Sequence, residues 1–432
     1  MKKIAPIALL VISLAMTACY SLKLSIVKKE TEYKISLKYQ SFNPDSIVRG
    51  KLLTYEKVET ITAENVKLLN PNHETDQYAR NDIEVYRIYY GSLYNGKQKV
   101  ALSGLIAFPK TDRPLVFCQY HHGTLLPFPF EGGMGATDAP SLFRFEKKYH
   151  DGAFDQVRAL GILPASYGYF VSMPDYAGYS ISRNLEHPYN VGSELAESSI
   201  DMIIAAKSFA QKLGIKISKE VYLTGWSEGA GAAYHVLKLI EQDYNKQIVP
   251  GCISILAGAY TMTDLTTYIA MQKKCDEAEI YNWTVYSYIS FSTVDISAAS
   301  IWKYPVGNQI EAIVTPSKKP KEIFHPEFLK ALNFNFPDDS ISQKFLPVRK
   351  LFSNDNICCN WIPKTPVYLH TGDKDGIVPD FNSKVAYKFL TENKAKTKLF
   401  IYKGDNHFTV VPKYFVNLVK EIDSCNTVFS KK

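Results

Sequence analysis

The sequence predicts an α/β fold in which helices flank a central, mostly parallel sheet. Short apolar runs typical of buried strands recur from about residue 82 onward, and helical stretches lie between several of them. Strands connected through helices pair in parallel, because a parallel pair needs a long crossover. With 46% hydrophobic and 22% charged residues, the 432-residue chain has the composition of a folded protein rather than a disordered one.

Residues 20–42 alternate between apolar and polar side chains, which predicts a hairpin-like extension at residues 19–43. Residues 44–75 are interpreted as partly helical, because Thr62-Ala63-Glu64-Asn65 opens a short run with apolar positions. The expected strands are Ile83–Tyr90, Val100–Phe108, Leu115–Tyr120, Tyr169–Met173, Val221–Thr224, Ile253–Leu256, Val367–Leu369 and Lys398–Tyr402, and the main expected helices are Ser193–Leu213 and Gly231–Tyr244. The α/β core is therefore predicted at residues 44–260 and 363–432.

Residues 261–362 interrupt the alternation, and an ordinary crossover does not need so many residues. The segment is rich in aromatic residues and contains a helical stretch at Asp264–Lys274. We expect an inserted, largely helical cap or lid, and a second independent domain is the alternative. Its aromatic residues would form either a wall for an acyl chain or the core of the cap itself.

The N-terminus has the pattern of a secretory signal. Met1-Lys2-Lys3 precedes an apolar run from Ile4 to Met16, followed by Thr17-Ala18-Cys19. Residues 1–18 resemble a bacterial lipoprotein signal, which implies lipidation of Cys19, and plain cleavage with secretion is the alternative. We therefore expect an exported protein that is anchored to a membrane on its periplasmic or cell-surface side.

Charge and cysteine content exclude some function classes. The formal net charge is +7, but no basic run is interleaved with aromatic residues, so we expect no nucleic-acid partner. Cys118 and Cys252 lie in apolar runs and should be buried, whereas disulfides of undetermined pairing are plausible at Cys275, Cys358, Cys359 and Cys425. No Cys or His spacing predicts a metal site, and no cofactor is expected.

The most informative motif is Gly225-Trp226-Ser227-Glu228-Gly229, a G-x-S-x-G pattern. An apolar strand precedes it and a helix start rich in small residues follows it, which is the strand–turn–helix context of a nucleophile elbow. Ser227 would then be exposed at the edge of the sheet as a nucleophile. The alternative is a serine that caps a glycine-rich helix.

A serine nucleophile needs a histidine base and a carboxylate that orients the base. Both residue types follow later strands: Asp373 and Asp375 come after strand 367–369, and His407 comes after strand 398–402. The order Ser, Asp, His is that of α/β-hydrolases. The residues alone leave the choice between the two aspartates open.

Five motifs in this order resemble the α/β-hydrolases, and more narrowly the secreted lipase and esterase family related to fungal lipase A. They are Tyr120-His121-His122-Gly123-Thr124, Met173–Tyr179 with His187-Pro188-Tyr189, the elbow, Gly372–Pro379 and His407. The resemblance runs from about residue 44 to the C-terminus. It implies an α/β-hydrolase fold and selects Asp375 as the acid, leaving Asp373 to cap the turn.

An oxyanion hole needs backbone amides, one of them from the residue after the nucleophile, Glu228. The resemblance implies a second donor at Gly123 or Thr124. It also places His122, Asp175, Tyr176 and Trp226 near the substrate, with His122 shaping the loop and Asp175 fixing its own loop by hydrogen bonds. A metal at His121 and His122 is disfavoured, because adjacent residues of an extended segment point to opposite faces. The other histidines, His73, His150, His187, His235, His325 and His370, are interpreted as structural or surface groups.

These observations together predict a serine-dependent carboxylic ester hydrolase of the lipase or esterase type. Its partner would be a small-molecule or lipid ester, and its catalytic residues would be Ser227, Asp375 and His407. A serine peptidase of the same fold is one alternative, because the same triad cleaves amides. A catalytically silent protein that binds a lipid or a glycan on this scaffold is the other.

Overall fold

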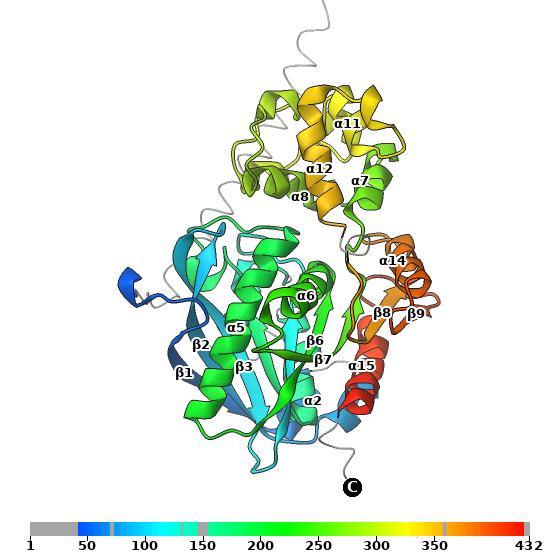
Figure 1. Ribbon diagram of the computed structural model, residues 1–432. Coiled ribbons are helices and arrows are strands. Elements are labelled where there is room, and N and C mark those ends of the chain that lie inside the picture. Colours follow the sequence, from blue (N-terminus) through cyan, green and yellow to red (C-terminus); the bar gives the residue numbers. More distant parts are fainter. Residues whose placement is uncertain (1–41, 70–72, 131–132, 146–153, 357–360, 427–432) are drawn as a thin grey trace, which may run out of the picture.

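The computed structural model describes residues 42–69, 73–130, 133–145, 154–356 and 361–426. The expected signal peptide, Cys19, nearly all of the hairpin-like extension, His150, Cys358 and Cys359 lie outside these residues. A nine-stranded sheet forms the centre of the molecule (Figure 1). Its strands are β1 (Leu52–Ile61), β2 (Ile83–Tyr94), β3 (Gln98–Pro109), β4 (Leu115–His121), β5 (Tyr169–Pro174), β6 (Ile217–Trp226), β7 (Val249–Leu256), β8 (Val367–Gly372) and β9 (Thr397–Tyr402).

The strand order in the sheet is β1-β2-β3-β5-β4-β6-β7-β8-β9. The first three strands pair antiparallel, β3 pairs antiparallel with β5, and all pairs from β5 to β9 are parallel. Every residue of β4 and β5 is buried, as expected for strands covered by helices on both faces. The parallel strands bring the carboxyl ends of β4, β6, β8 and β9 to one edge of the sheet, where a site can form.

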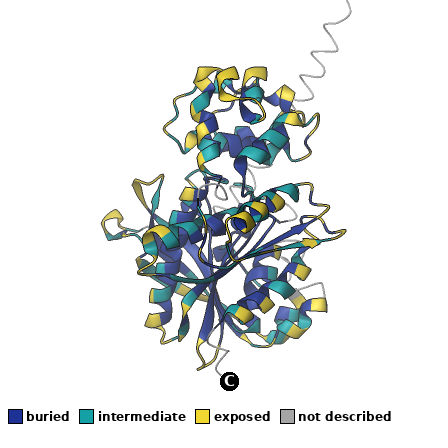
Figure 2. Ribbon diagram, turned by 45° about the vertical axis from the view of Figure 1, so that its right-hand side comes forward, coloured by how far each residue is buried: buried dark blue, intermediate teal, exposed yellow. Residues whose placement is uncertain are grey.

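Helices cover both faces of the sheet. On one face lie α5 (Gly192–Lys212), α6 (Glu228–Leu239) and α14 (Phe381–Glu392), whose apolar side chains share a core cluster with the strands. On the other face lie α2 (Ala63–Leu69), α3 (Asp155–Val157), α4 (Leu163–Tyr167) and α15 (Val411–Cys425). Figure 2 shows the strands as a buried layer between these helices.

The residues between β7 and β8 form a group of helices that lies beyond one edge of the sheet (Figure 1). These are α7 (Met262–Met271), α8 (Ala278–Ser290), α9 (Gln309–Ile313), α10 (Pro320–Ile323), α11 (Pro326–Leu332) and α12 (Leu346–Asn354). They enclose a hydrophobic cluster of their own that includes Tyr281, Tyr288 and Phe328. We refer to residues 262–354 as the helical insertion.

The predicted strands are all present, and the predicted helices at 193–213 and 231–244 correspond to α5 and to α6 with the π turn that continues it. One prediction was incomplete: residues 52–61 form strand β1, in the stretch that was interpreted only as partly helical. Cys118 and Cys252 are buried as expected, and Cys275 is buried as well. Among the described residues, Cys118, Cys252, Cys275 and Cys425 carry free thiols.

Candidate active site

Ser227 occupies the sharp turn between β6 and α6. Its backbone has φ 59° and ψ −126°, a conformation that costs energy for a residue with a side chain. The turn is held by the Ser227 amide, which donates to the Leu256 carbonyl on the neighbouring strand at 2.9 Å. The strain thus sits on the one residue whose hydroxyl the sequence predicts to react, and 8% of this residue is exposed.

The glycines of the elbow are required by close packing. A Cβ atom on Gly225 would lie 2.2 Å from the Gly229 carbonyl oxygen, and one on Gly229 would lie 2.1 Å from the His121 carbonyl oxygen. Both distances are far shorter than a van der Waals contact. Only glycine at these positions lets α6 start directly against β4 and β6.

His407 and Asp375 form a buried pair. His407 Nδ1 lies 2.6 Å from Asp375 Oδ2, and the backbone amides of Ile377 and Val378 donate to Asp375 Oδ1, each at 2.9 Å. Asp373 lies elsewhere, because its Oδ1 accepts from the Gly404 amide at 2.7 Å. The structure therefore brings Asp375 to the histidine and gives Asp373 the turn-capping position.

Trp226 connects the nucleophile turn to the histidine loop. Its ring centroid lies 5.3 Å from that of His407 and 5.7 Å from that of Phe408. The loops that carry Ser227 and His407 therefore adjoin at the sheet edge. Because Asp375 occupies Nδ1, the nitrogen of His407 that remains for a serine hydroxyl is Nε2.

The space in front of Ser227 is nearly closed. A cavity of about 20 Å³ is lined by residues of the helical insertion and of the core: Tyr189, Asn190, Ser227, Glu228, Ala259, Leu265, Ile280, Tyr281, Ile377 and Val378. The Tyr281 hydroxyl on α8 donates to the Ile377 carbonyl, two residues after Asp375. This volume holds a water molecule but no ester.

The loop after β4 lies directly against the elbow. A Cβ atom on Gly123 would lie 2.8 Å from the Trp226 carbonyl oxygen and 3.1 Å from Ser227 Cβ. The Gly123 amide donates to Gln156 Oε1 at 2.6 Å, which leaves the Thr124 amide as the better placed of the two expected oxyanion donors. The Thr124 hydroxyl is hydrogen-bonded to the Tyr189 hydroxyl at 2.7 Å. Glu228 is the first residue of α6, so its amide is one of the four that the helix itself does not satisfy.

The predicted substrate-proximal residues divide into two groups. Trp226 borders the site, whereas Asp175 and Tyr176 are fully buried beneath the loop after β4. Asp175 accepts from the Ser103 hydroxyl at 2.6 Å and from the Ser141 amide at 2.8 Å, and burial raises its pKa. The Tyr176 hydroxyl donates to the His122 carbonyl at 3.3 Å. Both residues thus support the loop from below and do not face the cavity at Ser227.

His121 and His122 have separate structural partners. His121 Nδ1 lies 2.9 Å from the Thr224 carbonyl oxygen, and burial lowers the pKa of His121 to about 4. The His122 ring lies between the carbonyl oxygens of Gly123 and Asp175, at 2.8 Å and 3.2 Å, and burial lowers its pKa as well. In the part of the chain that the structure describes, no group of three or more His, Cys, Asp or Glu side chains is arranged to hold a metal ion.

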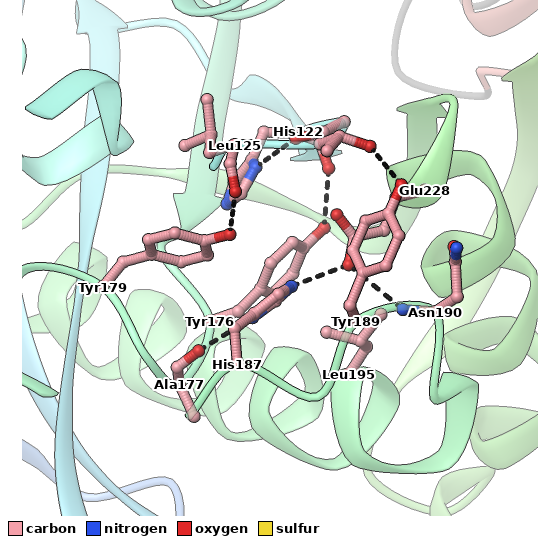
Figure 3. A network of polar contacts seen from close by, with 12 residues as sticks. His122, Leu125, Tyr176, Ala177, Tyr179, His187, Tyr189, Asn190, Leu195 and Glu228 are labelled. Atoms are coloured by element: carbon pink, nitrogen blue, oxygen red, sulfur yellow. Dashed lines mark hydrogen bonds and ion pairs between the residues drawn. The ribbon is translucent and has the colours of Figure 1, made fainter. Parts of the chain in front are cut away.

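Sequence analysis missed three residues that the structure brings to the site. Gln156 holds the Gly123 amide, Tyr189 bonds Thr124 and stacks on Trp283 of α8 at 4.0 Å, and His187 pairs with Glu228 (Figure 3). His187 had been interpreted as a structural or surface group. It is fully buried beside the elbow, and the motif His187-Pro188-Tyr189 was the signal that could have indicated its place.

Comparisons with known proteins concern the family and the fold. Residues 153–285 match the model of the secretory lipase family, and this stretch contains α5, the elbow and the first part of α8. No curated protein shows significant sequence similarity to the chain.

Three solved structures illustrate the shared fold. A hydrolase candidate from Legionella pneumophila has 21% identity and a TM-score of 0.72, over 87% of this chain and 98% of that chain. The rice cell wall degrading esterase LipA from Xanthomonas oryzae has 20% identity and a TM-score of 0.69, over 88% and 100%. Candida antarctica lipase A in its closed state has 15% identity and a TM-score of 0.59, over 89% and 85%. The shared fold is that of the α/β-hydrolases, and residues 153–285 carry the similarity to secretory lipases.

Proposed function

We propose that the chain hydrolyses carboxylic esters through a triad of Ser227, His407 and Asp375. The proposal rests on one observation: the strained turn at Ser227 and the hydrogen-bonded pair of His407 and Asp375, 2.6 Å apart, lie at the same edge of the sheet. Strain at a reactive side chain and a carboxylate that fixes the histidine are what serine catalysis requires.

In the proposed reaction Ser227 Oγ attacks the ester carbonyl carbon while His407 Nε2 takes the hydroxyl proton. The amides of Glu228 and Thr124 donate to the oxyanion of the tetrahedral intermediate. His407 then gives the proton to the departing alcohol, which leaves an acyl-enzyme. Water, deprotonated by His407, then attacks the acyl carbon, and His407 returns that proton to Ser227 Oγ as the carboxylic acid leaves.

We further propose that the helical insertion acts as a lid. Support comes from the cavity of about 20 Å³ at Ser227, whose lining includes Ile280 and Tyr281 of α8. An ester does not fit this cavity unless α8 moves away from the core. In this proposal Tyr281 contributes to both the core of the insertion and the acyl-chain wall, because it belongs to the hydrophobic cluster of the insertion and also lines the cavity.

Export agrees with the secretory lipase match. Among the described residues, no helix is long and apolar enough to cross a membrane. Anchoring through a lipid on Cys19 remains a proposal that rests on the N-terminal sequence, and mass spectrometry of the purified mature protein would test it. A lipid-modified N-terminal peptide that starts at Cys19 is the expected result.

The experiment for the proposed activity is hydrolysis of p-nitrophenyl esters from acetate to palmitate, with Ser227→Ala measured in parallel. We expect activity in the native protein and a loss of about 10³-fold or more in kcat for the variant. The chain-length optimum separates an esterase from a lipase. Equal rates in both proteins would contradict the proposal, cleavage of aminoacyl-arylamides in place of esters would favour a peptidase, and a folded protein without either activity would favour a binding role.

A further inference from the structure

The residue after the nucleophile, Glu228, places its carboxylate against a histidine outside the triad. His187 Nε2 lies 2.7 Å from Glu228 Oε1, and neither side chain is exposed to solvent. We propose that His187 is a positioning residue for ester hydrolysis, which fixes the Glu228 carboxylate and balances its charge beside the oxyanion hole. The inference rests on the function proposed above.

The hydrogen bonds of His187 define how many protons the pair holds. Figure 3 shows the ring bonded on one side to Ala177 and on the other to Glu228. Nδ1 lies 2.8 Å from the Ala177 carbonyl oxygen, which can only accept, so Nδ1 carries a proton. A second proton must lie between Nε2 and Oε1, because two lone pairs would otherwise face each other at 2.7 Å. Whether that proton belongs to nitrogen or to oxygen, the pair has zero net charge.

Apart from His187, few groups stabilise a negative charge on the Glu228 carboxylate. The Asn190 amide donates to Oε1 at 3.3 Å, and Oε2 is buried without a hydrogen-bond partner among the residues that the structure describes. An unpaired buried carboxylate is strongly unfavourable. His187 is therefore the group that balances Glu228.

The surroundings of the pair are mostly aromatic. The ring centroids of Tyr179, Trp283, Tyr176 and Tyr189 lie 4.7, 5.6, 5.9 and 6.2 Å from that of His187. His122 interacts electrostatically with both members of the pair, and burial shifts its pKa toward the neutral form. In surroundings of such low polarity, an uncompensated charge acts over a longer distance than in water.

The location of Glu228 connects this pair to the reaction. The Glu228 amide is a proposed donor to the oxyanion, so a negative side chain on the same residue would repel the charge that develops there. Because that charge exists in the transition state and not in the bound ester, the loss of His187 should lower kcat and leave KM nearly unchanged.

The test compares His187→Asn with the double variant His187→Asn, Glu228→Gln on p-nitrophenyl butyrate. The single variant leaves Glu228 unbalanced, and its kcat should fall by about tenfold or more. Removal of the carboxylate in the double variant should raise kcat again, by about fivefold or more over the single variant. His235→Asn is the matched control, because His235 on α6 pairs with another carboxylate, Asp355, at 3.4 Å. Its kcat should stay within about threefold of the native value.

A native kcat in His187→Asn, or a double variant no more active than a single variant that is folded, would overturn the proposal. A merely structural role predicts this second outcome, since a second core substitution does not repair packing. Thermal unfolding of each variant shows whether it is folded.

If His187→Asn does not fold, a measurement on the native protein tests whether His187 and Glu228 share a proton. Proton NMR should show two hydrogen-bonded protons far downfield, one lost in Asp375→Asn and the other lost in Glu228→Gln. A spectrum with only the Asp375-dependent proton would overturn the proposal. The NMR experiment needs no ester, so its result does not depend on the proposed function. If the proposed function is wrong, the folded native protein will neither hydrolyse esters nor react at Ser227 with a fluorophosphonate.

Discussion

Two aspartates two residues apart have different partners, and this difference predicts different effects on catalysis. Asp375→Asn keeps the shape of the side chain but removes the carboxylate that orients His407, so kcat should fall by about 10³-fold. Asp373→Asn affects only the turn at Gly404, and kcat should stay within about threefold. Steady-state kinetics on one short-chain ester checks both, and comparable losses in the two variants would contradict the assignment.

The catalytic residues could be predicted because they lie in recognisable motifs. The residues that position a backbone amide or another side chain could not be predicted. Ser227 and His407 could be predicted because each follows an apolar strand in a recognisable order. The residues alone left the choice between Asp373 and Asp375 open, because it depends on which side chain faces the histidine, and only the family resemblance selected Asp375. Gln156 on α3 and His187 on a loop reach the site from segments far from the elbow in the sequence, and only the fold brings His187 to Glu228.

At the scale of elements, the junction of β6 and α6 depends on glycine. We expect Gly229→Ala to lower the free energy of unfolding by about 2 kcal/mol or more, because the new Cβ would lie 2.1 Å from the His121 carbonyl oxygen. Gly231→Ala, one turn into α6, meets nothing closer than 3.6 Å and should leave stability unchanged or raise it by up to about 1 kcal/mol. Urea unfolding of the two variants measures the difference, and similar values would contradict this view of the elbow.

The contact between α8 and the core predicts how the lid responds to mutation. Tyr281→Phe removes a hydrogen bond to the Ile377 carbonyl that holds α8 down, worth about 1 kcal/mol. If opening limits the reaction, kcat/KM on p-nitrophenyl octanoate should rise by up to about fivefold. Tyr304→Phe is the control, because the Tyr304 hydroxyl bonds Asn282 and Glu311 within the insertion. An equal response of both variants would argue against α8 as the moving part.

Strands with apolar runs were predictable from the sequence, and β1 was not. Residues of β4 and β5 are buried along their whole length, so their sequences are continuous apolar runs. Strand β1 lies at the sheet edge with several exposed positions, and charged residues such as Glu56 and Lys57 interrupt its apolar pattern. The packing of the helical insertion could not be predicted either, because it depends on contacts between helices that are far apart in the sequence.

At the scale of the whole molecule, buried Asp138 predicts a pH dependence of stability. Burial raises its pKa from 3.8 to about 6, so the folded state binds a proton that the unfolded state has released between those values. The contribution of Asp138 is therefore fully present below about pH 4 and is lost as the pH rises to about 6. Relative to Asp138→Asn, the native protein should lose up to about 2 kcal/mol of unfolding free energy over this range.

Urea unfolding at pH 4.5 and pH 6.5 measures this loss for the native protein and for Asp138→Asn. Asp339→Asn, at an exposed position, is the matched control and should follow the native curve. An Asp138→Asn variant with the same pH dependence as the native protein would contradict the assignment.

The central claim is that Ser227 is the nucleophile of an ester hydrolase, and covalent labelling tests it most directly. A fluorophosphonate should attach one group to the folded native protein, peptide mass spectrometry should place it on Ser227, and ester hydrolysis should disappear in proportion to labelling. Ser227→Ala should take up no label. Labelling at another residue, or ester hydrolysis that persists in Ser227→Ala, would contradict the account.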